Sequence, residues 1–360
     1  MIAIYSDSLI IDREWIPALR FDRPYRVVHS IDQFEQTPAD YRIAFTAHRL
    51  HVDHDTEIRF EIKVKRLSQA SKLVFAIESE LHQFHWSIWA ACHADNVYWL
   101  QPGTVNDRDD MRQHILPWQD WFKTTAGLYQ HIPMILDRLR PYDVKPLAFD
   151  ALLGSPKPHR NFVRDSVIEH GLSEKITMTY GGKWDNKSFY AQDYFIFEPG
   201  TELIDPLIGT CDWVKYQGHQ CHLSQIIPID VYNNTAYSIV AETDADNSLS
   251  FFSEKTAKPL IARRLFVAFT GYRFLYNLRE LGFKTFGDVI DESYDEIFNA
   301  RERYQAAFYQ VRRLCEMDQR MVLDKIKYIL EHNHNHIMTT NWNDFSIKRV
   351  NDLIKQVILN

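Results

Sequence analysis

Apolar runs and amphipathic segments alternate along the first third of the chain. Runs of strand length occur at residues 2–5, 25–31, 41–47, 72–79 and 96–103. The stretch from Leu73 to Ile77 is continuously apolar, as expected for a strand buried on both faces of a parallel sheet. The segment HQFHWSIWAACHA, residues 82–94, has a helix-compatible pattern between two of these runs. Strands that alternate with helices predict an α/β layer architecture.

A second α/β region is expected after Pro141, which ends a helix-like segment. Its expected strands are 145–154, 175–180, 236–243 and 265–269, and its expected helices are 160–170, stopped by Gly171, and 271–283, capped by Gly282. Beyond these, the pattern predicts amphipathic helices over 291–331, a polar linker over 332–342 and a last helix over 343–360. The chain is therefore divided into α/β domains at 1–141 and 142–300 and C-terminal helices at 301–360, which are expected to pack back across the domains.

Composition narrows the class of protein. The chain has 360 residues, 45% of them hydrophobic, and no apolar run long enough for a membrane-spanning helix, so no membrane insertion is expected. Early aspartates and the lack of a basic region distinguish the N-terminus from a signal peptide. Four cysteines are too few for a disulfide framework and favour a cytoplasmic location. The net charge of −7 argues against general electrostatic binding of nucleic acid, but it allows a local basic site for a phosphorylated small molecule.

A basic loop, LLGSPKPHRNFV, connects an expected strand to an expected helix. It places Lys157, His159 and Arg160 at the start of the helix, where free backbone N–H groups and the helix dipole favour anions. Arginine can also bind a phosphate with two parallel hydrogen bonds. The loop predicts a phosphate or pyrophosphate clamp, and the alternative is a solvated basic turn.

A second helix start lies in FFSEKTAKPLIARRLFVAF. Ser253 is suited to the N-cap position, and Glu254 complements the helix dipole. Lys255 is unfavourable in the first turn unless an anion balances it, and Pro259 is expected to kink or shorten the helix. Lys255 is therefore the more informative residue of the pair, either as an anion ligand or as a surface lysine.

Acidic and histidine side chains follow the apolar strand that ends near residue 78. Ligands of open α/β sheets bind outside the carboxyl ends of the strands, so Glu80 is a candidate general base and His85 a candidate to orient the proton. The alternative is that these residues cap the following helix.

Other segments give weaker signals. The histidines at 332, 334 and 336 have no carboxylate or cysteine at metal-ligand spacing, and the cysteines at 211 and 221 form no CxxC pair. The motifs of P-loop NTPases, classical dehydrogenases and serine hydrolases do not occur. No metal site is predicted.

The segment 242–286 resembles the donor-binding segment of fucosyltransferase-like glycosyltransferases, which have the two-Rossmann GT-B architecture. On this resemblance Glu242 matches the acidic strand end, and Ser253, Glu254 and Lys255 match a T/S-E-K element. There the glutamate would bind nucleoside or sugar hydroxyls and the lysine the diphosphate. The basic loop is similar to an R-x-H-R-like ending in related proteins of viral or polysaccharide-locus type.

In the basic loop His159 and Arg160 match that ending, while Lys157 stands where arginine is usual. The chain also departs from the family at Arg263 and Arg264, which replace a small-residue approach to the turn.

The resemblance implies a GT-B glycosyltransferase with an acceptor-side domain at 1–141 and a nucleotide-sugar-binding domain at 142–300. The donor is a nucleotide-diphosphate sugar, the acceptor is a glycan or a modified nucleobase, and no metal cofactor is expected. Two alternatives stay open: a non-catalytic binding or assembly protein on this scaffold, and a viral transferase acting on modified DNA bases. The interpretation requires that the basic loop and the Ser253–Lys255 element face one site.

Overall fold

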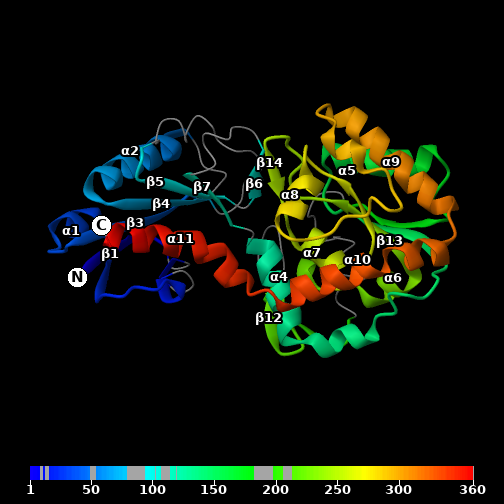
Figure 1. Cartoon of the computed structure of the whole chain (residues 1–360), viewed down its shortest axis with the longest axis horizontal. Helices are drawn as coiled ribbons and strands as arrows, with labels where there is room; N and C mark the ends of the chain where they lie inside the picture. Colours follow the sequence, from blue (N-terminus) through cyan, green and yellow to red (C-terminus); the bar gives the residue numbers. More distant parts are fainter. Residues whose placement is uncertain are drawn as a thin grey trace. The chain divides into compact units, whose positions relative to one another are not determined.

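The computed structural model describes residues 1–8, 11–12, 16–48, 54–78, 94–101, 103–106, 114–118, 120–181, 198–205 and 213–359. It divides into two compact units: unit 1 comprises Met1–Gln119 and Asn341–Asn360, and unit 2 comprises Asp120–Thr340. Both units contain a parallel sheet with helices against it, which confirms the α/β class (Figure 1). The sequence-based boundary at 141/142 lies inside unit 2, because α4 (Asp120–His131) packs against helices of that unit.

The sheet of unit 1 has the strand order β2-β1-β3-β4-β5-β7, with every neighbouring pair parallel. The elements of the unit are β1 (Ile2–Ser6), η2 (Ile16–Ala18), β2 (Tyr25–Val28), α1 (Ile31–Gln36), β3 (Tyr41–His48), α2 (His54–Ala70), β4 (Leu73–Glu78), β5 (Val97–Gln101), β6 (Gly103–Val105), β7 (Ile115–Pro117) and α11 (Trp342–Leu359). The expected strands of the first third are thus present.

Alternate side chains of this sheet meet different helices. Ile43 and Phe45 of β3 lie in a core with Val350 and Ile354 of α11. On the opposite face the helices α1 and α2 contact the sheet, and the ring of Trp99 of β5 packs edge-on against the ring of Phe60 of α2. The period-2 alternation of strand side chains therefore gives each face its own helical layer, and the C-terminal helix forms one of them.

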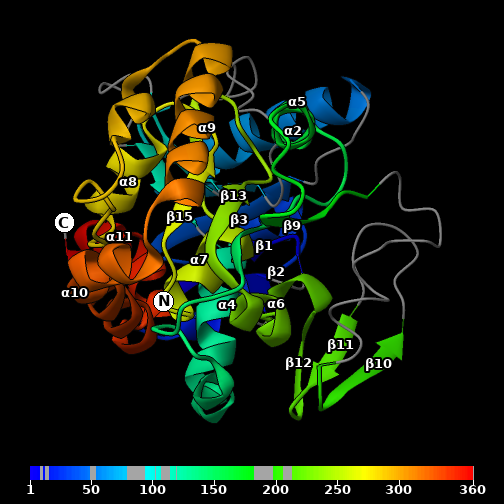
Figure 2. The same ribbon diagram turned by 90° about the vertical axis from the view of Figure 1, so that its right-hand side faces the viewer.

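Unit 2 is built on a sheet with the order β15-β13-β8-β9, again parallel throughout. Helices α5 and α9 contact β15 on one face, and α6 and α7 contact β13 on the other (Figure 2). A separate antiparallel sheet has the order β10-β11-β12. The remaining elements of unit 2, with these, are η4 (Pro133–Arg138), β8 (Leu147–Leu152), α5 (Pro158–Glu169), β9 (Ile176–Thr179), β10 (Thr201–Asp205), β11 (Trp213–Tyr216), β12 (His219–His222), η6 (Leu223–Gln225), α6 (Ile229–Asn234), β13 (Thr235–Ala241), β14 (Leu249–Phe251), α7 (Glu254–Ile261), β15 (Phe266–Phe269), α8 (Phe274–Glu280), η7 (Glu292–Glu296), α9 (Ala300–Glu316) and α10 (Gln319–Thr339).

The prediction of a polar linker over 332–342 is wrong, because α10 continues to Thr339. The ring of His332 bonds the carbonyl oxygen of Gly282 at 2.9 Å, and the ring of His336 bonds that of Leu281 at 2.8 Å. Histidines suit this position because they can satisfy the last carbonyl groups of a helix, here α8. Gly282 has φ +92°, and a Cβ there would lie 2.8 Å from His336 Nε2, so the close approach requires glycine.

The division of the C-terminal region also differs from the expected 301–360 unit. Helices α9 and α10 belong to unit 2 and only α11 belongs to unit 1. In the part of the chain that the structure describes, no helix combines the length and apolarity needed to cross a membrane.

Candidate functional site

The candidate site lies at the carboxyl edge of the unit 2 sheet, where β8 and β13 are neighbours. After β8 the chain continues to β9 on one side, and after β13 it continues to β15 on the other. The strand order therefore reverses between β8 and β13, and in open α/β sheets this is where ligands bind. The basic loop follows β8, and residues 242–244 follow β13, so the topology brings both to this edge.

Side chains of the basic loop bind main-chain carbonyl oxygens just beyond the end of β13. Helix α5 begins at Pro158, with Lys157 as its N-cap residue. The Glu242 carbonyl oxygen accepts hydrogen bonds from His159 Nε2 at 2.8 Å and Arg160 Nη2 at 3.0 Å. Lys157 Nζ donates to the Thr243 carbonyl oxygen at 2.5 Å. All three predicted basic residues thus contact the same two-residue stretch.

Burial decides the protonation of His159. Its pKa is lowered to about 3, first by burial and then by the charge of Arg160. The ring is therefore neutral at pH 7, and Nε2 donates to the Glu242 carbonyl oxygen. A neutral histidine in this position orients the strand end and carries no charge toward an anion.

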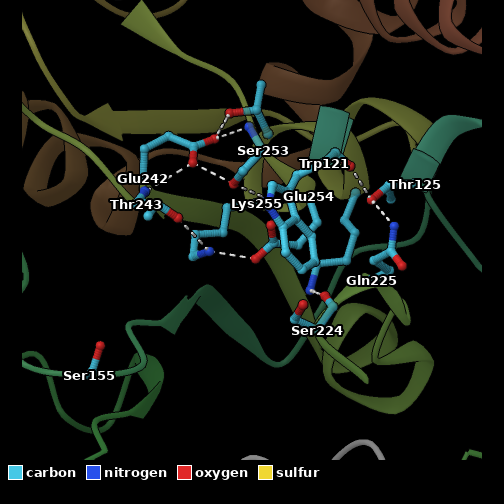
Figure 3. A network of polar contacts seen from close by, with 12 residues as sticks. Trp121, Thr125, Ser155, Ser224, Gln225, Glu242, Thr243, Ser253, Glu254 and Lys255 are labelled. Carbon is cyan, nitrogen blue, oxygen red and sulfur yellow. Dashed lines mark hydrogen bonds and ion pairs between the residues drawn. The ribbon is translucent and has the colours of Figure 1, made fainter. Parts of the chain in front are cut away.

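The start of α7 reaches the same point from the other side. Ser253 is the N-cap residue, as predicted, and its Oγ accepts from Lys255 N at 3.2 Å. Lys255 Nζ donates to Thr243 Oγ1 at 3.2 Å and forms an ion pair with Glu254 (Figure 3). Thr243 therefore meets lysines of both predicted segments, Lys157 at its carbonyl and Lys255 at its hydroxyl.

The anion that balances Lys255 is its neighbour Glu254. Burial opposes the ionisation of Glu254, but Lys255 and Lys258 outweigh burial and lower the pKa of its carboxyl group. The sequence interpretation placed Glu254 on ligand hydroxyls, whereas the structure shows it bonded to the lysine. The Lys255 side chain keeps 21% of its surface exposed.

Glu242 joins the strand end to the first turn of α7. Its side chain is fully buried, and four donors surround the carboxylate. Oε1 accepts from Ser253 N at 3.0 Å and Thr256 Oγ1 at 2.5 Å. Oε2 accepts from Ser253 Oγ at 2.5 Å and Thr243 N at 3.1 Å (Figure 3). Its carboxylate is occupied by the protein's own donors.

A further lysine, Lys258 of α7, anchors this helix to η6. It is buried, its Nζ donates to the Ser224 carbonyl oxygen at 2.7 Å, and burial lowers its pKa to about 8. Gln225 of η6, the residue after Ser224, donates from Nε2 to Thr125 Oγ1 of α4 at 3.2 Å, which connects η6 to α4 (Figure 3). These contacts hold α7 in place relative to the rest of unit 2.

Three residues at this edge were missed by the sequence interpretation: Thr256, Lys258 and Asp244. Lys258 stands four residues after Glu254, the spacing of an ion pair on a helix, and this signal was available. Asp244 lies in an acidic loop, and burial raises the pKa of its carboxyl group to about 6. Nothing in the pattern distinguished it from its neighbours.

Arg264 has a structural role. It is buried, and its Nη2 forms a 2.8 Å ion pair with Asp150 of β8. The same guanidinium donates to the carbonyl oxygens of Tyr232, Thr235 and Tyr237. Arg263 has φ +55° and contacts Glu331 through Nε at 3.1 Å. The arginine pair therefore gives no separate support for a non-catalytic binding surface.

The predicted general base Glu80 and its partner His85 lie outside the described residues. Within the described ranges, no three histidine, cysteine or acidic side chains are grouped as a metal site. Comparison with protein-family models, with curated proteins and with solved structures finds no match to the chain.

Proposed function

We propose that unit 2 binds a nucleotide-diphosphate sugar and that the protein is a glycosyltransferase built from two Rossmann-like domains of the GT-B type. The observation that carries this proposal is the convergence of Lys157 and Lys255 on Thr243. Two segments far apart in the sequence deliver their cations to one residue, at the sheet position where such folds bind ligands.

An anion would complete the balance of charge at this edge. Burial, followed by the charges of Arg160 and Lys255, lowers the pKa of Lys157 to about 8, so the cations repel one another in the free protein. A diphosphate would relieve this repulsion and would raise the same pKa again. The N-terminus of α5 adds the positive end of a twelve-residue helix.

The same features favour departure of a diphosphate. When the bond between the sugar C1 and the diphosphate oxygen breaks, negative charge grows on the leaving group, and fixed cations stabilise that charge. The acceptor hydroxyl forms the new bond to C1, and its proton passes to a base. Glu80, oriented by His85, is the residue that the sequence interpretation assigns to this step.

Calorimetric titration with UDP, GDP, dTDP and their sugar conjugates tests the proposal. At least one should bind, and Lys255→Ala should weaken that binding by about 10- to 150-fold, the value of a charge-assisted hydrogen bond. Lys215→Ala, which removes an exposed lysine of β11, is the matched control and should bind like the wild type. The proposal is refuted if the wild-type protein binds none of the panel.

Turnover separates the enzyme from the non-catalytic alternative. A transferase releases free nucleoside diphosphate when donor and acceptor, or donor and water, are incubated with it. Binding without any release would favour the binding protein. The engagement of Lys157, His159 and Arg160 with main-chain carbonyl groups is the observation that keeps this alternative open, because a structural clamp would make the same contacts.

A further inference from the structure

The carboxylate of Asp244 is positioned differently from the other acidic groups at this edge. Asp244 is only 7% exposed and lies three residues beyond the end of β13. Its Oδ1 accepts from Asp246 N at 2.9 Å. Its Oδ2 is buried and has no hydrogen-bond partner among the described residues. A buried acceptor without a donor is destabilising, so its presence calls for a reason.

The neighbouring acidic groups have protein partners. Glu242 accepts four hydrogen bonds, and Glu254 pairs with Lys255. Oδ1 of Asp246 accepts from Ser248 N at 2.7 Å and Ser248 Oγ at 2.5 Å. Asp244 thus differs from them by offering an acceptor that the described chain leaves open.

Asp244 is next to the proposed anion site in the chain and is coupled to it by charge. Asp244 directly follows Thr243, the residue that both lysines contact. The charges of Asp244 and Lys157 influence each other's pKa, so the two side chains are electrostatic neighbours. A ligand with its diphosphate between the lysines would bring its adjoining ring close to Asp244.

We propose that Asp244 Oδ2 accepts a hydrogen bond from a ligand hydroxyl group, and this inference rests on the proposed function of unit 2. A carboxylate repels phosphate oxygens and attracts O–H donors, so it recognises the part of the ligand next to the diphosphate. Such a hydroxyl belongs either to the ribose of the nucleotide or to the transferred sugar. In both cases the residue selects a hydroxylated ring beside an anionic group.

Asp244→Asn is the informative variant. The asparagine oxygen can keep the bond from Asp246 N, while its NH₂ group replaces the open acceptor with a donor. Affinity for the ligand should fall by about 5- to 15-fold, the difference between a charge-assisted and a neutral hydrogen bond. The stability of the protein should stay the same or rise, because the variant removes a buried charge. A merely structural role predicts the opposite, a loss of stability without a specific loss of binding.

The titration uses full-length wild-type protein, Asp244→Asn and the control Asp324→Asn, which removes an exposed carboxylate of α10. Weaker binding of both the nucleoside diphosphate and its sugar conjugate by Asp244→Asn assigns the hydroxyl to the ribose. Removal of the 2′- or 3′-hydroxyl of the nucleotide should then cost the wild type more affinity than it costs the variant, which keeps only a neutral hydrogen bond to it. Weaker binding of the sugar conjugate alone assigns the hydroxyl to the sugar.

Two results overturn different claims. Unchanged binding of every ligand by a folded Asp244→Asn variant overturns the role of Asp244 and leaves the proposed function standing. Absence of binding by the wild type overturns the proposed function and this inference with it. If Asp244→Asn does not fold, the deoxynucleotides and deoxysugar conjugates decide on the wild type alone: equal affinity with and without each hydroxyl overturns the inference.

Discussion

Replacement of Glu242 by glutamine tests whether this carboxylate fastens the first turn of α7 to the end of β13. Each carboxylate oxygen serves one backbone N–H: Oε1 accepts from Ser253 N and Oε2 from Thr243 N. Glutamine keeps one oxygen and replaces the other with an NH₂ group. In either orientation of the amide, one of these two backbone N–H groups then faces another donor.

The cost follows from this geometry. A buried N–H that loses its acceptor costs about 1–3 kcal/mol, and the change of the remaining bonds from charge-assisted to neutral costs about 1 kcal/mol more. The hydroxyl groups of Ser253 and Thr256 can rotate to accept from the new amide, so they add little. We expect a loss of about 2–4 kcal/mol in the free energy of unfolding.

Urea denaturation followed by circular dichroism measures this loss. Glu242→Gln should lower the midpoint of unfolding while the slope with urea is unchanged. Glu280→Gln, on the exposed side of α8, is the matched control and should stay within about 0.5 kcal/mol of the wild type. A loss below about 1 kcal/mol for Glu242→Gln would refute the assignment of this residue as a structural bridge.

The remaining predictions concern charge. Nucleotide binding should be strongest between about pH 6 and pH 8. Below this range Asp244, with a pKa of about 6, loses its negative charge, and above it Lys157, with a pKa of about 8, loses its positive charge. A flat profile from pH 5 to 9 would contradict this. Lys157→Ser should weaken nucleotide binding strongly but change the free energy of unfolding by less than about 1 kcal/mol, because a serine cap on α5 offsets the lost hydrogen bond to the Thr243 carbonyl oxygen. A loss of more than about 2 kcal/mol in urea denaturation would count against it. Arg264→Ala should destabilise the protein by about 3–5 kcal/mol, because Asp150 is left buried without its cation. A thermal unfolding midpoint near that of the wild type would show that the pair is dispensable.

The sequence pattern predicted the local elements well where periodicity and caps are strong. The strand LFVAF and the helix that starts after Ser253 occur as expected, because both signals are contained within a few neighbouring residues. The linker prediction at 332–342 failed for a physical reason. Polar histidines in a helix are favourable when another helix presents open carbonyl groups to them, and the sequence does not show where those carbonyl groups lie.

The candidate site was predictable in its residue types but not in their roles. Basic residues at two helix starts indicated an anion site, and the structure brings Lys157 and Lys255 to one threonine. The partner of Arg264 is Asp150, 114 positions away, and no pattern along the chain predicts that pair. For the same reason the sequence could not show that Glu242 is enclosed by donors or that Asp244 keeps an open oxygen.

Two helices begin at the carboxyl edge of the sheet, and their first turns are used differently. In α7 three of the N–H groups are occupied, since Ser253 N bonds Glu242, Lys255 N bonds Ser253 Oγ, and Thr256 N bonds the Ser253 carbonyl oxygen at 3.2 Å. Helix α5 has proline at its first position and no side-chain cap, so it is the better place for a phosphate.

The contribution of α7 to binding is then a single side chain, that of Lys255. Glu242 would affect binding only by holding α7 where Lys255 reaches Thr243. Residues that act through one contact are not additive, so Glu242→Gln combined with Lys255→Ala should bind nucleotide no more weakly than Lys255→Ala alone. Additive losses would mean that Glu242 contacts the ligand directly.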